Sequence, residues 1–259
     1  MNKNCLFCGA RLNSENRSKE HVFPGWLLQE LGIHPTDQYI GLHGADFEDI
    51  PRSRRRQGAH TVVQGSVCTG CNLGWMSDLE NRANPLLRAM QNLQQVRLSK
   101  DDCVLLATWI FKTLTLYSVT TNYRKIVPDS VFEYVRLNLM PPPGNHVEIA
   151  YAPNGPKATL RTRLSPVKFA MFDENQCDSA YINSQLQQSY VLCAQVSHLL
   201  MRVVGLPKQG MWRRCDAEHQ NMLRIFPNAP AVIDWPKQGA YHKGLDDITF
   251  GVALAPIFL

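Results

Sequence analysis

Four cysteines near one end of the chain have a spacing that suits a metal ion. Cys5 and Cys8 form one C-x-x-C pair, and Cys68 and Cys71 form a second. Each short loop lets two thiolate sulfurs meet one Zn²⁺ at about 2.3 Å in tetrahedral geometry. A four-sulfur site leaves no open coordination position, so the pattern predicts a structural zinc and places any catalysis elsewhere. The same cysteines could instead stay reduced without metal or form a redox pair.

Three polar residues close to these pairs could carry chemistry. Glu20 and His21 are adjacent between the two pairs, and Asn72 directly follows the second. Imidazole exchanges protons near neutral pH, and carboxylate and amide oxygens are hard ligands suited to Mg²⁺ or Mn²⁺. Neighbouring residues on a regular strand point to opposite faces, so we expect a bend or strand end here, near Pro24. Without the neighbouring cysteine pairs, the simpler interpretation is that Glu20 is an exposed acid, His21 a packed histidine and Asn72 a helix cap.

The order C-x-x-C, acid-His, C-x-x-C-Asn resembles the HNH superfamily of ββα-metal endonucleases, most closely the zinc-bound layout of phage recombination endonuclease VII. The resemblance covers the first third of the chain and implies two strands and a helix around one divalent ion. It implies Glu20 and Asn72 as ligands of a catalytic Mg²⁺ or Mn²⁺, His21 as the general base, and phosphodiester hydrolysis as the reaction. By analogy with most of the superfamily, we expect DNA as the substrate and defence against phage as a setting.

The segment between His21 and Cys68 departs from the family pattern. It is longer than a two-stranded hairpin needs, so we expect an insertion over residues 27–59. The central asparagine of many HNH proteins is not evident before Cys68. His60 or Gln64 could orient the base, although a polar strand residue is the favoured interpretation of each.

The insertion carries a cluster of arginines on an expected surface loop, residues 51–58. Guanidinium groups bind phosphates in bidentate fashion and add salt-sensitive affinity, but a charge run is often only a solvated loop. The candidate nucleic-acid contacts are Lys19, Arg52, Arg54, Arg55 and Arg56.

A helix is expected after the second cysteine pair, because apolar residues recur there at alternating spacings of four and three. A capping box at Ser77–Glu80 could open it, or it could begin nearer Asn72. Asn84-Pro85 should bend or interrupt it. Its apolar positions are Leu79, Ala83, Leu86, Met90 and Leu93.

From residue 100 onward the sequence reads as an apolar-rich α+β domain. We expect a long helix capped by Asp101 or Asp102, and a second from Pro128-Asp129 to Leu139. Residues 191–204 could form a buried strand pair or a helix. Strands are predicted in the runs at 146–152, 159–165, 168–172, 189–205 and 248–259.

The expected fold class is therefore α+β, with a zinc-stapled ββα-metal nuclease module at residues 1–95. An α+β domain with two helices and several strands follows at residues 96–259. That second domain could recognise substrate, sense a signal or mediate association, with a regulatory partner or as a homo-oligomer.

Composition limits the protein class. A chain of 259 residues that is 44% hydrophobic can bury a sizeable core, which argues against disorder. The net charge of +5 suits a nucleic-acid partner, but ordinary proteins reach it too. The polar start and the lack of an apolar stretch of about 20 residues predict no signal peptide, no membrane partner and a cytoplasmic location.

The remaining cysteines are expected to be buried small hydrophobes: Cys103, Cys177, Cys193 and Cys215.

Two alternatives to the nuclease stay open. The first is a non-catalytic zinc module that only binds nucleic acid, in which no activity depends on Glu20 or His21. The second is an interaction protein that the zinc module stabilises, with its function in the second domain. Aromatic residues such as Trp26, Trp75 and Trp109 are expected to belong to the core in every case.

Overall fold

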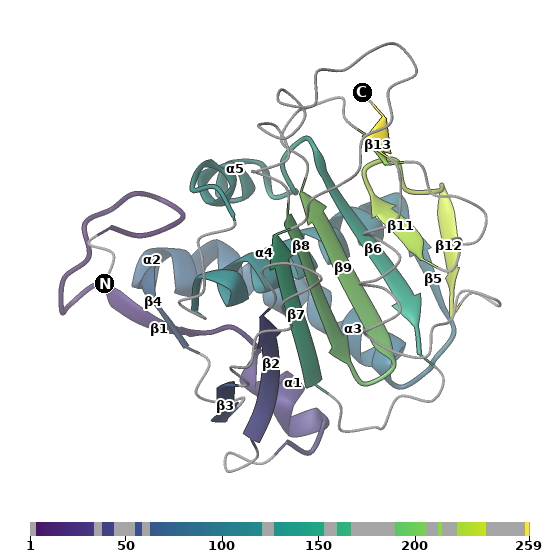
Figure 1. Cartoon of the computed structure of the whole chain (residues 1–259), viewed down its shortest axis with the longest axis horizontal. Coiled ribbons are helices and arrows are strands. Elements are labelled where there is room, and N and C mark those ends of the chain that lie inside the picture. The colour runs from purple at the N-terminus through teal and green to yellow at the C-terminus, as the bar shows by residue number, and fades with distance from the viewer. Residues whose placement is uncertain are drawn as a thin grey trace.

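The computed structural model describes residues 4–33, 38–43, 55–58, 63–120, 127–152, 160–166, 190–205, 212–213, 222–236 and 257–258. Side chains are described in these ranges except at 38–43, 55–58, 63–64, 160–166, 212–213 and 257–258. The fold combines helices with mainly antiparallel sheets, so the predicted α+β class is confirmed (Figure 1).

A seven-stranded sheet forms the largest element of the fold (Figure 1). Its central strands are buried on both faces, which explains why residues 190–205 are apolar without a strand-like alternation. This ambiguous run is a strand pair joined at Ser197, so the helical alternative was wrong. In spatial order the strands are β11 (Leu223–Phe226), β6 (Asn145–Tyr151), β9 (Leu199–Gly205), β8 (Tyr190–Val196), β7 (Leu160–Pro166), β2 (Gln38–His43) and β3 (Arg55–Gly58).

Two of these strands come from the expected insertion. Strand β2 pairs with β3 in antiparallel fashion and with β7 in parallel fashion, so the insertion extends the sheet formed by the second half. Arg55 and Arg56 belong to β3, which corrects the expectation of a loop at that point. Arg52 and Arg54 lie outside the described residues.

Helix α4 (Lys100–Thr120) packs across the sheet and forms the centre of the core (Figure 1). It opens with a reciprocal cap, in which the Ser99 N–H donates to Asp102 Oδ2 at 2.9 Å and the Asp102 N–H donates to Ser99 Oγ at 3.2 Å. Ser99 is therefore the cap residue, and the predicted Asp102 completes the cap by accepting the Ser99 N–H; Asp101 takes no part in these bonds. The helix is long and apolar enough to span a membrane, contrary to the sequence expectation, but it is mostly buried among the protein's own residues.

The other predicted elements of the second half agree where the chain is described. Helix α5 (Ser130–Asn138) ends at Leu139 in a left-handed conformation, close to the predicted bounds. The strands predicted at 146–152 and 159–165 are β6 and β7. The run at 168–172 lies outside the described residues, as does most of 248–259. Short pairs join β5 (Val96–Ser99) with β12 (Val232–Trp235), and β10 (Trp212–Arg213) with β13 (Ile257–Phe258).

The N-terminal region has two paired strands followed by helices. Strand β1 (Arg17–His21) pairs in antiparallel fashion with β4 (Val63–Cys68), and a short helix α1 (Gly25–Glu30) follows β1. After β4 the chain forms three successive helical segments, α2 (Thr69–Cys71), η2 (Asn72–Met76) and α3 (Ser77–Gln91).

Helix α3 corrects two details of the prediction. The first helical turn begins at Thr69, and the chain kinks at Gly74, whose φ of −91° and ψ of −117° are not helical. Met76 and Ser77 are already helical and no described side chain caps α3, so the Ser77–Glu80 pattern does not act as a capping box. Pro85 lies inside α3 without ending it. Pro85 and Asn81, whose carbonyl loses its donor, are both exposed residues, so water can replace the missing bond.

Candidate metal centre and the residues around it

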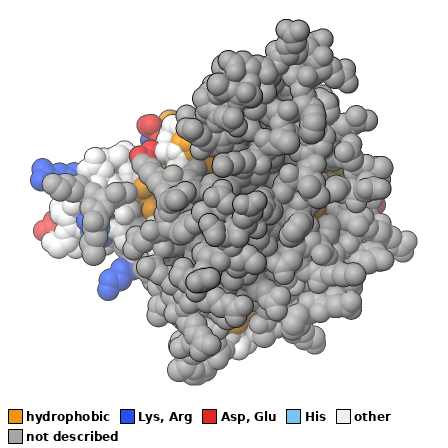
Figure 2. Space-filling view, in the orientation of Figure 1, with side chains coloured by type: hydrophobic (Ala, Val, Ile, Leu, Met, Phe, Trp, Pro, Cys, Tyr) orange, Lys and Arg blue, Asp and Glu red, His pale blue; other side chains and the backbone are white. Residues whose placement is uncertain are grey.

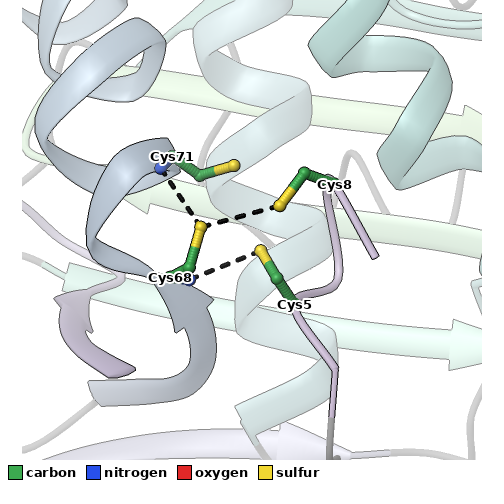
Figure 3. A group of neighbouring side chains, drawn as sticks. All are labelled: Cys5, Cys8, Cys68 and Cys71. Atoms are coloured by element: carbon green, nitrogen blue, oxygen red, sulfur yellow. Dashed lines mark hydrogen bonds between the residues drawn. The ribbon is translucent and has the colours of Figure 1, made fainter. Parts of the chain in front are cut away.

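The four cysteine sulfurs of the N-terminal region converge on one point (Figure 3). Their Sγ atoms all lie within 4.8 Å of one another, and those of Cys8 and Cys68 are 3.6 Å apart. Among the described residues this is the only group of three or more His, Cys, Asp or Glu side chains close enough to share a metal ion. Four thiols at these separations can hold a metal such as zinc.

Local backbone geometry builds the two halves of this cluster. In the first half, Gly9 adopts a φ of +71°, and its N–H donates to the Cys5 carbonyl at 3.0 Å, which turns the chain tightly behind Cys8. In the second, Cys68 ends β4 and precedes α2, and its Sγ accepts the N–H of Cys71 at 3.4 Å. The Cys68 N–H donates in turn to Cys5 Sγ at 3.4 Å, which joins the halves.

The protein surroundings affect the four thiols unequally. Burial raises the pKa of Cys8 and of Cys71 above the ordinary thiol value. Burial also acts on Cys5, but backbone N–H groups of Cys8, Cys68 and Phe7 outweigh it and lower the pKa of that thiol. A divalent soft cation offsets the cost of burying thiolates, so the donor set fits zinc.

Aromatic packing attaches the cluster to the rest of the fold. Phe7 lies between Cys5 and Cys8, and its ring contacts Trp75 and Phe132 edge-on at centroid distances of 5.0 and 5.5 Å. Arg136 of α5 donates its Nε–H to the Phe7 carbonyl at 3.0 Å. A helix of the second half therefore contacts the cysteine loop directly.

Asn72 lies where the second cysteine pair meets β1. Its Nδ2 donates to Ser18 Oγ, which ties the start of η2 to the strand. The amide nitrogen is thereby engaged, and Oδ1 remains the ligand-type atom of this side chain. Sequence reasoning missed Ser18, because a serine on a strand has no spacing that marks it.

Glu20 faces the interior and has an internal partner. It is 6% exposed, and its Oε1 lies 3.5 Å from Lys112 Nζ. Lys112, in the middle of α4, is 0% exposed and also binds Glu80 Oε1 at 2.7 Å. Sequence reasoning missed Lys112 and Glu80, although a lysine in the apolar middle of a helix, far from the charged first turn, was a detectable signal.

Burial dominates the ionisation of Glu20. Desolvation raises its pKa above the ordinary value; the positive charge of Lys112 opposes this rise and the negative charge of Glu80 adds to it. The two carboxylates share one ammonium, so the cluster carries one excess negative charge when all three groups are ionised.

His21 and Lys19 lie on either side of Glu20 in the chain and are both exposed. The β1–β4 ladder shifts register between Ser18 and Glu20, and β1 ends at His21, as the adjacent Glu-His pair led us to expect. Glu20 and His21 nevertheless differ sharply in burial. Within the described residues, no recorded contact joins Glu20, His21 and Asn72.

The other predicted residues fall into clear groups. Gln64 pairs with Glu20 across the β1–β4 ladder, while His60 lies outside the described residues. Trp109 belongs to the core, and Trp26 and Trp75 pack against it, as expected. Cys103 and Cys193 are buried, as predicted; Cys177 and Cys215 are outside the described part. Basic side chains project from the N-terminal region on the left of Figure 2.

The fold and the site together define an α+β protein with a four-cysteine cluster that could hold a metal such as zinc, where the N-terminal loop meets the end of β4 and the start of α2. Comparisons with protein-family models, curated proteins and solved structures found no match for the chain.

Proposed function

We propose that the chain is a divalent-metal-dependent HNH-type endonuclease that hydrolyses phosphodiester bonds in nucleic acid, with DNA as its substrate. The observation that carries this proposal is the contact between Asn72 and Ser18 beside the cysteine centre. It places the residue after the fourth cysteine, at the helix start, against the strand that ends in the Glu20-His21 pair. Two strands and a helix joined by a zinc-type centre are the arrangement that the resemblance implies.

His21 is suited to act as the general base. Its side chain is exposed at the end of β1, so water and a phosphodiester can both reach it. A neutral imidazole within hydrogen-bond reach of a water molecule can accept its proton as the water attacks phosphorus.

Glu20 and Asn72 would hold the catalytic ion. Their carboxylate and amide oxygens are ligands that Mg²⁺ and Mn²⁺ accept, and a bound ion stabilises charge on the phosphodiester and its leaving oxygen. Glu20 already directs its carboxylate at a cation, the ammonium of Lys112, in a cluster with excess negative charge. The excess negative charge favours binding of a second cation at Glu20, where that ion would compete with the ammonium of Lys112.

Basic residues near the strand would supply affinity for the phosphate backbone. Lys19 is exposed at the register shift of β1, one residue before Glu20. The arginines of residues 52–56 would add to this affinity, which should fall with rising salt concentration as counterion release becomes less favourable.

One observation favours a second candidate, a zinc module that binds nucleic acid without cutting it. The carboxylate of Glu20 points toward Lys112 inside the protein, whereas His21 is exposed. Such a module would bind DNA equally well with or without Mg²⁺, and neither Glu20 nor His21 would matter.

Plasmid cleavage tests the proposal. Zinc-loaded protein is incubated with supercoiled plasmid, with no added ion or with Mg²⁺ or Mn²⁺, and His21→Ala is run beside the wild type at equal zinc content. We expect cleavage only with the divalent ion and a loss of about 10²- to 10⁴-fold in His21→Ala. Partial rescue of His21→Gly by free imidazole would identify the side chain as the proton acceptor.

Other outcomes separate the candidates. DNA binding without cleavage in any ion favours the non-catalytic module, and equal cleavage by wild type and His21→Ala contradicts the assigned base. The proposed role in defence predicts that phage plate less efficiently on bacteria expressing the wild type than on those expressing His21→Ala.

A further inference from the structure

Three charged side chains from three different elements meet at Glu20, the proposed metal ligand. Lys112 on α4 contacts Glu20 on β1 and Glu80 on α3 through the same Nζ atom. The Oε1 atom of Glu20 lies 3.5 Å from Lys112 Nζ, and that of Glu80 lies 2.7 Å from it. The Glu20 side chain is 7% exposed and the Glu80 side chain 22% exposed. Glu80 is therefore the closer partner of the Lys112 ammonium, and Glu20 is the more distant one.

Lys112 cannot act on a substrate directly. Its side chain is 0% exposed, so no phosphate can reach the ammonium in this conformation. Lys112 acts on a cation at the surface by way of its two carboxylate partners, of which Glu20 is the proposed metal ligand. The distances give that effect a direction: Glu80 is the nearer carboxylate to the ammonium, at 2.7 Å against 3.5 Å for Glu20, and its negative charge offsets part of the ammonium's repulsion of a cation at Glu20.

We propose that Lys112 is the resident counter-ion of Glu20 and sets how strongly the site binds a divalent metal. Its ammonium competes with the metal for the Glu20 carboxylate, and Glu80 limits this competition by holding the ammonium on its own side. The inference rests on the proposed function in one respect, that Glu20 is a metal ligand.

The competition follows from electrostatics in a weakly screened environment. Two cations next to one carboxylate repel each other, and the repulsion is strong in a site with an effective dielectric constant of about 20. Without the ammonium, Glu20 and Glu80 would face each other as like charges, which a divalent ion relieves. Without the Glu80 charge, no negative charge next to Lys112 would offset the ammonium's repulsion of a metal ion at Glu20.

Two substitutions therefore have opposite expected effects on metal affinity. Lys112→Met should tighten Mn²⁺ binding by about tenfold or more, and Glu80→Gln should weaken it by a similar factor. Glu20→Gln should remove the site. Glu30→Gln is the matched control, because Glu30 makes a surface ion pair with Arg88 at 3.5 Å and has no contact with the cluster.

Electron paramagnetic resonance of free Mn²⁺, titrated against full-length zinc-loaded protein, measures these affinities without any nucleic acid. Zinc content and thermal unfolding are recorded for each variant. Should Lys112→Met fail to fold, Lys112→Gln replaces it, because glutamine removes the positive charge and its amide N–H groups can still donate to the two carboxylates; tighter Mn²⁺ binding is again expected.

The signs of the two effects decide the outcome. A purely structural role for the cluster predicts that Lys112→Met and Glu80→Gln weaken binding together or leave it unchanged, and either result overturns the proposal. So does Mn²⁺ binding that persists in Glu20→Gln. If the opposite effects are found but the plasmid is never cut, the nuclease proposal fails and the role of Lys112 stands; if the plasmid is cut but the two variants bind Mn²⁺ as the wild type does, only the role of Lys112 fails.

Discussion

The Sγ atoms of Cys8 and Cys68 lie 3.6 Å apart, although 60 positions separate these residues in the chain. Sulfurs around a tetrahedral zinc with bonds of about 2.3 Å are about 3.8 Å apart, so this separation is close to that of zinc ligands. It is too long for a disulfide, whose sulfurs are about 2.05 Å apart. An ion here would hold the N-terminal loop to the end of β4 and to the first helical turn.

Purified protein should contain one zinc ion per chain, and Cys68→Ser should lose it. Cys68 both faces the other three thiols and accepts the Cys71 N–H, so its replacement removes a ligand and loosens the helix start. We expect zinc content to fall to near zero and the melting temperature to drop by several degrees or more. Elemental analysis and calorimetry measure the two effects.

Cys103→Ala provides the comparison for the zinc prediction. Cys103 is equally buried but lies on α4 and is not part of the cluster. The Cys103→Ala substitution should lower the free energy of unfolding through lost packing and leave the zinc content unchanged. A Cys68→Ser protein with full zinc content would contradict the assigned ligand set.

Asn72 and Ser18 should be coupled in stability. Each single alanine substitution removes the same hydrogen bond between η2 and β1, so the double variant should cost less than the sum of the two. A double-mutant cycle from denaturant unfolding should give a coupling of about 0.5–1.5 kcal/mol. Additive effects would indicate that the bond does not form in solution.

Arg136→Ala should speed the release of zinc. Its Nε–H holds the Phe7 carbonyl between Cys5 and Cys8, so its loss should let the cysteine loop open more often. Transfer of zinc to a colorimetric chelator should be several-fold faster than in the wild type. Arg97→Ala is the control: within the described part of the chain the Arg97 side chain pairs with Asp234 at an exposed position, and this variant should release zinc at the wild-type rate.

Glu20→Gln should become more stable relative to the wild type as the pH rises. Burial raises the pKa of Glu20 above its ordinary value of 4.5. The folded protein therefore binds this proton more tightly than the unfolded chain does, and the stability that this contributes at low pH is lost as the pH rises through the raised value. Glutamine does not ionise and escapes that loss.

Denaturant unfolding of both proteins, from below pH 4.5 to neutrality and without added Mg²⁺, measures this difference. Glu30→Gln, at a partly exposed surface pair, should show no such trend. A difference between Glu20→Gln and wild type that shrinks toward neutral pH would mean that Lys112 outweighs burial at Glu20.

Patterns confined to short segments could be predicted from the sequence. Two C-x-x-C pairs predicted a cluster of four sulfurs because the cysteines of each pair must lie close together, and metal chemistry favours joining the pairs. The helices at 100–120 and 130–138, and β6 and β7, followed from local apolar patterns and breakers. Local signals misled at Ser77, which is already helical and does not cap α3, and at Pro85 in one respect, since it does not interrupt α3.

Relationships between distant segments were decided only by the tertiary structure. That Glu20 turns inward while His21 is exposed depends on Lys112, 92 positions away, because a buried ammonium requires carboxylate partners. The strands of the insertion join the large sheet through β7, a pairing that no local pattern specifies. The sequence by itself determined the residue types and short spacings that can bind metal and move protons. Which of those groups meet depends on free energies of packing and desolvation that arise only when distant elements come together.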